Sequence, residues 1–291
     1  MRAVLEPGFF DSAPVRVALL VGGVVAVVSG IVGTFTVVRG QSYAGHALAD
    51  ISVTGGSGSF LIGISPLWGF AGTSVVAAGI MDMIGVRRPR GRDLATGIVR
   101  GAGLGLAALF LYWDTTHTST TGATITILFG SMFAIDTSVI GVVAAFSLAA
   151  VGIVAVLYRP LLLSSASTDL AVVRGVRVRI AGVLCLISIA LAVSLSALTI
   201  GAILSTALLV GPAATAVRLT SRPGLALIWS ALIGLAATWL GILLSFDSYY
   251  WPPARRGWPV SFFVVALILI FYLLAQARRG RDGKRQCSPG S

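Results

Sequence analysis

The sequence consists mostly of long apolar stretches, separated by short polar segments. Hydrophobic residues make up 56% of the chain and charged residues 11%. Several uncharged runs approach the roughly 20 residues that an α-helix needs to cross a lipid bilayer. Because backbone polar groups in lipid must be hydrogen-bonded within the protein, we expect runs of this length to be helices. The sequence therefore predicts an all-α polytopic membrane protein.

Eight or nine transmembrane helices are predicted, since one of nine apolar runs could be broken or partial. The runs cover residues 17–38, 45–64, 66–86, 94–112, 139–158, 180–197, 199–217, 225–246 and 260–277. They leave no room for a soluble domain, so we expect residues 1–291 to form one transmembrane domain with a basic tail at 278–291.

Two further features of the apolar runs suggest irregular structure. Residues 122–135 are too short to span a bilayer, and we expect them to be re-entrant, with protein or water around any non-helical backbone. The pairs Gly55-Gly56 and Gly211-Pro212 are candidate breaks in their helices, as in transporters built from inverted repeats.

The basic residues are distributed asymmetrically between the predicted loops. The formal net charge is +11, and cytoplasmic loops of membrane proteins carry an excess of Lys and Arg. With the basic loop 86–93 in the cytoplasm, all but four of the 21 basic residues fall on the cytoplasmic side, the four being Arg2, Arg16, Arg255 and Arg256. This orientation puts the N-terminus outside, a tight turn at 197–199 outside, and the C-terminus in the cytoplasm. It favours contact with membrane lipids over binding of nucleic acid.

His46 and Asp50 lie four residues apart in a run whose other residues are apolar, small or hydroxylic. Residues at this spacing share one face of a helix. A carboxylate at the centre of a membrane span costs roughly 2.5–3.5 kcal/mol on insertion scales, so it usually faces a pathway or a partner. We interpret the pair as the first candidate for function, and the alternative is a mutual hydrogen bond that neutralises both groups.

The other acidic residues near the apolar runs are weaker candidates. Asp82 lies close to Arg87 and Arg88, where an ion pair at the membrane interface is expected. Asp114 and His117 fall in a predicted polar outer loop, where solvated side chains are expected and a weak cation site is the lesser alternative.

The segment 159–179 differs from the other predicted loops because it contains its own helix signals. Ser167 or Thr168 can cap a short helix, and Asp169 favours its positive N-terminal end. Gly175 suits the left-handed residue that ends a helix. We therefore predict a short capped helix on the cytoplasmic face, and from spacing alone a docking element and an ordinary surface helix are equally good interpretations.

Five blocks in the same order resemble the zinc/manganese/iron ABC importer permeases. The longest covers residues 193–222 and includes the sequence IGAILSTALLVGPAATA, which is similar to the signature span of that family. The other four blocks are 45–55, 92–97, 128–131 and 169–175. The resemblance extends over roughly residues 17–274 and thus covers almost the whole chain.

The resemblance implies a homodimeric permease of the bacterial inner membrane that imports a divalent cation. It also implies two partners, an extracellular metal-binding protein and a separate ABC ATPase, because this chain contains no Gly-x-x-x-x-Gly-Lys-Ser/Thr phosphate loop. Residues Thr168, Asp169, Ala171 and Gly175 match the family's coupling helix, which docks on the ATPase. No cofactor and no catalytic residue are implied, since the cation is the transported substrate.

The resemblance also gives His46 and Asp50 a role in holding the cation, with one departure. The family usually has Asp at the first position and His at the second, and this chain has the two exchanged, with Thr54 where Pro is common. A mixed nitrogen and oxygen donor set suits zinc, manganese or iron. A permease for a metal chelate and an intramembrane metalloenzyme are the alternatives, although catalytic zinc usually has three protein ligands and water.

Overall fold

The computed structural model describes residues 12–85, 89–117, 121–130, 132–135, 137–249 and 257–286, and within these residues it contains helices and no strand. The α-helices are α1 (Ala13–Val38), α2 (Ser42–Ile62), α3 (Pro66–Gly85), α4 (Pro89–His117), α5 (Thr121–Phe129), α6 (Ile140–Ala166), α7 (Thr168–Val173), α8 (Val178–Ile200), α9 (Ala202–Leu219), α10 (Pro223–Ser248) and α11 (Val260–Gln286). The prediction of an all-α protein is confirmed.

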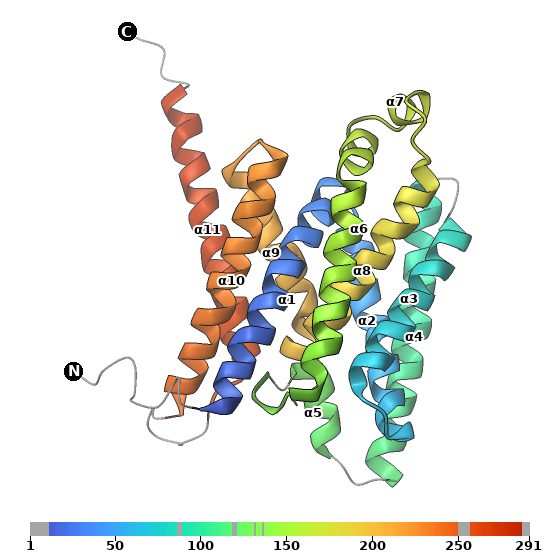
Figure 1. The fold of residues 1–291 in the computed structure, drawn as a ribbon, viewed down its shortest axis with the longest axis vertical. Helices are drawn as coiled ribbons and strands as arrows, with labels where there is room; N and C mark the ends of the chain where they lie inside the picture. The colour runs from blue at the N-terminus through green and yellow to red at the C-terminus, as the bar shows by residue number, and fades with distance from the viewer. Residues whose placement is uncertain are drawn as a thin grey trace, which may run out of the picture.

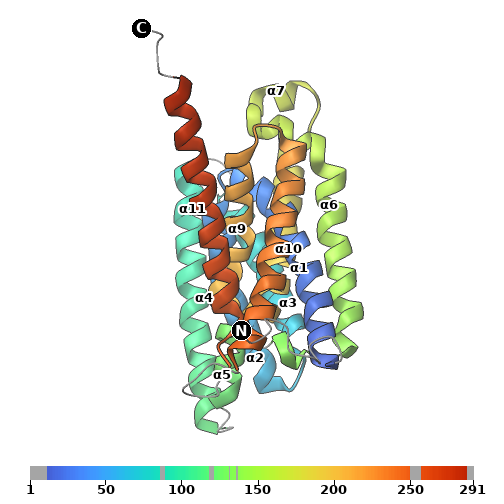
Figure 2. The same cartoon turned by 90° about the vertical axis from the view of Figure 1, so that its left-hand side faces the viewer.

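The long helices form one bundle with two distinct ends (Figure 1). The end that carries α7 and the last turns of α11 is called the α7 end below, and the opposite end, where α1 begins and α5 lies, is called the α5 end. Seen from the side, α11 lies against α9 and α10 and projects beyond the bundle at the α7 end (Figure 2).

Each of the nine predicted apolar runs coincides with one long helix. Within the part of the chain that the structure describes, seven of these helices are long and apolar enough to cross a membrane, and α2 and α3 are not among the seven. In α2 the reason is its content of His46, Asp50 and many small or hydroxylic residues. It nevertheless packs along both α3 and α4, and most of its residues are buried.

Helix α1 is packed at the centre of the bundle, in contact with α6, α8, α9 and α10. Its glycines allow this close packing: a Cβ at Gly33 would overlap the carbonyl oxygen of Leu209, and one at Gly30 would lie 2.8 Å from the carbonyl oxygen of Ser230. The Ser230 hydroxyl donates a hydrogen bond to the Gly30 carbonyl at 2.8 Å. Small residues are the usual means by which membrane helices approach closely.

The turn predicted at 197–199 lies a few residues too early. Helix α8 continues to Ile200, and the break falls at Gly201, whose φ is +93°. Since φ values in this region strain residues with a Cβ, glycine is the natural end of α8. The Gly201 N–H still donates to the Ala197 carbonyl at 3.0 Å.

The segment between α4 and α6 begins and ends at the α5 end of the bundle (Figure 1). Helix α5 is followed by Gly130, whose φ is +76°, and a Cβ there would overlap backbone atoms of Thr199, Ile200 and Gly201. Gly130 thus contacts the main chain of the α8–α9 junction, and the re-entrant character of residues 122–135 stays a prediction.

Two sequence-based interpretations are wrong. Asp114 does not lie in a loop, because α4 continues through it to His117 and leaves its side chain 3% exposed. The pair Gly55-Gly56 does not break α2, and Pro212 lies inside a continuous α9. Gly55 instead lets α2 approach α3, since a Cβ there would overlap the carbonyl oxygen of Gly69.

Replacement of Gly33 by Ala should destabilise the bundle, because overpacking a tight contact typically costs about 1–3 kcal/mol. The control is Gly72→Ala in α3, where nothing lies within 4 Å of the added Cβ. We expect the melting temperature of the purified protein in detergent to fall by several degrees for Gly33→Ala and to stay or rise for Gly72→Ala. Equal melting temperatures would contradict the packing assigned to α1.

Candidate functional site

His46 and Asp50 project from the same face of α2, as their spacing predicted. The distance from His46 Nε2 to Asp50 Oδ2 is 3.9 Å, and the exposed fractions of the two side chains are 42% and 16%. This distance exceeds the 2.7–3.2 Å or so of an N–H···O hydrogen bond. The alternative of a mutual hydrogen bond is therefore not found.

The strong partner of Asp50 is Arg100 on α4. Arg100 Nε donates to Asp50 Oδ2 at 2.5 Å, and the arginine side chain is 31% exposed. Asp50 is eight residues along α2 from Ser42, which at about 1.5 Å per residue places it roughly 12 Å into the bundle from the α7 end. The ion pair thus joins two helices at some depth in the bundle.

His46 is held by a third helix. Its Nδ1 lies 3.2 Å from Oγ1 of Thr206 on α9. The other ring nitrogen, Nε2, is left on the side of Asp50. The site therefore comprises His46 and Asp50 from α2, Arg100 from α4 and Thr206 from α9.

Arg100 and Thr206 were not predicted as site residues. Arg100 falls inside the predicted span 94–112, and an ionisable residue within a span is itself a signal of function or of a buried partner. The sequence contained this signal, but Arg100 served there only as one of the basic residues assigned to the cytoplasmic side. Thr206 gave no signal, because its position opposite His46 depends on how α2 packs against α9.

The geometry of the pair is compatible with a single metal ion. Bonds from zinc to a His nitrogen or a carboxylate oxygen are about 2.0–2.2 Å long, so one ion can bridge two atoms 3.9 Å apart. Among the described residues, however, no group of three or more His, Cys, Asp and Glu side chains could hold a metal. A cation bound by His46 and Asp50 would take its other ligands from hydroxyls, water or a second chain.

Helix α7 has the capped structure that the sequence predicted, with Ser167 as its cap. The Leu170 N–H donates to Ser167 Oγ at 3.3 Å, and Asp169 lies in the first turn. Gly175 has a φ of +76°, and its N–H donates to the Val172 carbonyl at 2.9 Å. The helix therefore has a defined start and end of its own.

One side of α7 is apolar and exposed. Val173 is 87% exposed, and Leu170 and Val172 are also exposed, whereas Ala171 is fully buried against the rest of the protein. Thr168 begins the helix, and its side chain lies outside the described part of the structure. This helix lies at the α7 end of the bundle (Figure 1).

Asp82 forms an ion pair with an arginine that the sequence did not single out. Its Oδ2 lies 3.6 Å from Nε of Arg179, near the start of α8. The expected partners Arg87 and Arg88 lie at positions outside the described residues. Because Arg179 is 68% exposed, the pair resembles surface ion pairs, whose contribution is about 0–1 kcal/mol.

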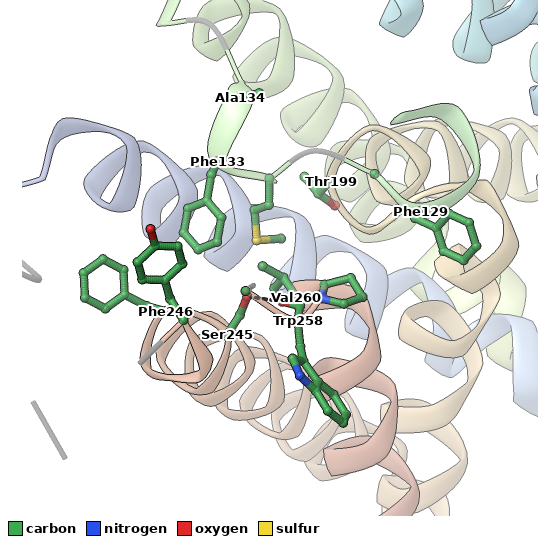
Figure 3. Close-up of a pocket in the computed structure, with 13 residues that line it drawn as sticks. Phe129, Phe133, Ala134, Thr199, Ser245, Phe246, Trp258 and Val260 are labelled. Atoms are coloured by element: carbon green, nitrogen blue, oxygen red, sulfur yellow. Dashed lines mark hydrogen bonds between the residues drawn. The ribbon is translucent and has the colours of Figure 1, made fainter. Parts of the chain in front are cut away.

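A cavity of about 550 Å³ opens at the α5 end. Figure 3 shows aromatic side chains around it, Phe129, Phe133, Phe246 and Trp258, together with Thr199 and Ser245. The Ser245 hydroxyl is occupied by a hydrogen bond to the Trp258 carbonyl at 2.7 Å. Such a lining suits an apolar group rather than a cation.

Comparison with known proteins assigns the chain to a family. Residues 13–276 match the ABC 3 transport family. A manganese transport system membrane protein, MntC of Listeria innocua, is 27% identical over 247 residues, which cover 84% of this chain and 85% of the relative. The manganese import system permease protein ScaB of Streptococcus pneumoniae is 28% identical over 275 residues, covering 94% of each chain.

Solved structures share the fold. PsaBC from Streptococcus pneumoniae, in complex with a Fab, superposes with a TM-score of 0.78 at 24% identity, over 92% of each chain. A metal-chelate type ABC transporter in an inward-facing conformation gives a TM-score of 0.72 at 14% identity, covering 96% of this chain and 91% of that one.

The family match makes the chain a multi-pass transport protein rather than a catalyst. The alternative of an intramembrane metalloenzyme is thereby abandoned. The chain belongs to the ABC 3 transport family.

Proposed function

We propose that the chain is the permease subunit of an ABC importer for a divalent metal cation, and that manganese is the first candidate ahead of zinc and iron. The observation that carries the proposal is the family match together with relatives named for manganese transport. The mixed donors of His46 and Asp50 suit the same group of metals.

His46 and Asp50 are proposed to line the cation pathway. The His46 side chain remains 42% exposed on the surface of the single chain, although α2 is otherwise mostly buried. A second copy packed against this side would enclose the pair in a central path, which supports a homodimer. Alternating access would then open the path to one side of the membrane at a time.

Helix α7 is proposed to be the coupling helix. Its exposed Leu170, Val172 and Val173 offer an apolar contact for an ATPase, and Asp169 and Gly175 fix its two ends. The chain itself has no phosphate-binding loop, so a separate ATPase must supply the energy.

The orientation that follows puts the α7 end in the cytoplasm and the α5 end outside. The loop residues Arg39, Arg174 and Arg222 and the end of α11 all lie at the α7 end of the chain's helices, in agreement with the positive-inside rule. An external metal-binding protein would meet the α5 end, and the basic tail would lie near the lipid headgroups.

One observation supports a second candidate, a permease for a metal chelate. The ion pair between Asp50 and Arg100 removes the net negative charge from the centre of the site. A cargo that brings its own ligands needs less charge from the protein than a free cation does.

His46→Ala and Asp50→Ala should each lower uptake of radioactive manganese in cells without other importers. We expect at least a tenfold loss for each and no larger loss for the double variant, because neighbours that serve one function are not additive. The control is Asp82→Ala, which removes another arginine-paired carboxylate and should leave uptake near the wild-type level. Normal uptake by the double alanine variant, at equal expression, would remove the pair from the pathway.

Gly175→Val should weaken transport by uncoupling the ATPase, since valine disfavours the left-handed conformation with φ of +76°. The matched control is Gly182→Val in α8, where nothing lies within 4 Å of the added Cβ. We expect less ATPase to copurify with Gly175→Val while both variants insert into the membrane normally. Full copurification and full transport by Gly175→Val would refute the coupling role.

Reporter fusions test the orientation. A reporter that is active only in the cytoplasm should be active when it follows Arg285 and silent when it is inserted within 248–258, since the positive-inside rule assigns these positions to opposite sides. The reverse pattern would invert the proposed topology and assign α7 to the outer face.

A further inference from the structure

The two candidate ligands and one arginine converge on a single oxygen atom. Asp50 Oδ2 lies 2.5 Å from Arg100 Nε and 3.9 Å from His46 Nε2. A metal ion that bridges His46 and Asp50 through these atoms would therefore contact the same oxygen that now accepts from Arg100. A guanidinium and a divalent cation on one oxygen would repel each other strongly in a site of low dielectric.

The packing of α2 on α4 does not depend on this ion pair. The Thr54 hydroxyl donates to the Gly103 carbonyl at 2.6 Å, and a Cβ on Gly103 would lie 2.6 Å from Cγ1 of Ile51. The two helices thus have a close contact of their own, about one turn further along. The ion pair is available for another role.

A second polar side chain, that of Tyr43, lies close to α4 near Arg100. The Tyr43 hydroxyl lies 3.8 Å from the position of a Cβ on Gly97, on the turn of α4 that precedes Arg100. Tyr43 is therefore the candidate partner of the guanidinium while Asp50 binds another cation.

We propose that Arg100 is a built-in competitor of the transported cation, which occupies Asp50 when the site is empty and sets how tightly the site binds metal. The proposal rests on the proposed function of His46 and Asp50 as cation ligands. When the cation binds, it replaces Arg100 as the positive partner of Asp50. The carboxylate is therefore paired with a positive charge both in the empty site and in the occupied site. Because Arg100 lowers the affinity, it also favours release of the cation after the site has opened inward.

Removal of the competitor should tighten metal binding. The test measures Mn²⁺ binding to the purified permease–ATPase complex in lipid nanodiscs without nucleotide. Arg100→Gln should bind Mn²⁺ at least tenfold more tightly than the wild type, and Arg100→Lys, which keeps the charge, should stay close to the wild type. The matched control is Arg179→Gln, which breaks the arginine–aspartate pair at Asp82 and should not change binding. The double variant Asp50→Asn with Arg100→Gln should not show the tighter Mn²⁺ binding of Arg100→Gln alone.

Arg100→Gln leaves Asp50 without its arginine partner, which can destabilise the metal-free protein. Thermal stability with and without Mn²⁺ is therefore a second measurement. Mn²⁺ should then raise the melting temperature of Arg100→Gln by more degrees than that of the wild type. Binding by Arg100→Gln that is no tighter than wild-type binding, together with an equal thermal shift, would overturn the proposal.

Uptake in cells separates this proposal from the proposed function. If the wild type imports manganese and Asp50→Ala does not, but Arg100→Gln binds Mn²⁺ no more tightly, the competitor role of Arg100 is wrong and the function stands. If the wild type imports no manganese, zinc or iron, the proposed function fails. Tighter Mn²⁺ binding by Arg100→Gln would in that case still identify Arg100 as the residue that keeps the cation out.

Discussion

The bundle depends on the close approach of helix backbones at small residues. Helices that meet in a bilayer gain little from the hydrophobic effect, so their association relies on packing and on hydrogen bonds between them. Gly33 lets α1 contact the backbone of α9 at Leu209, and the side chain of Leu209 in turn meets Gly45 on α2. This chain of contacts fixes the position of α9, and with it the hydroxyl of Thr206 opposite His46. The candidate site is thus a product of glycine packing some distance away.

The helices were predictable because the bilayer requires a minimum apolar length and leaves few alternatives to a helix. Their ends were less predictable. Thr199 and Ile200 are compatible with a helix, and only the positive φ of Gly201 ends α8. Asp114 was misplaced for a related reason: a polar stretch was interpreted as a loop, although α4 continues through it and buries the carboxylate. The caps of α7 were predicted correctly because they depend on neighbouring residues alone.

The candidate site was predictable in part, and the limit was tertiary contact. Spacing was enough to put His46 and Asp50 on one helix face. The ion pair with Arg100 joins residues 50 positions apart, and the contact with Thr206 joins residues 160 positions apart. Neither could be derived from a local pattern, although an arginine inside a predicted span already required some partner. The sequence therefore located the carboxylate, and the structure supplied the charge that balances it.

The contact between Gly130 and Gly201 constrains the main chain at the α5 end of the bundle. The two residues meet through main-chain atoms, with no side chain between them. Helix α5 is also held by side chains, since Ile127 is 1% exposed and lies in a buried cluster with Val53, Phe70 and Ala197. Any residue larger than glycine at either position would force the two main chains apart, because its Cβ would lie within 2.6 Å of backbone atoms of the other segment.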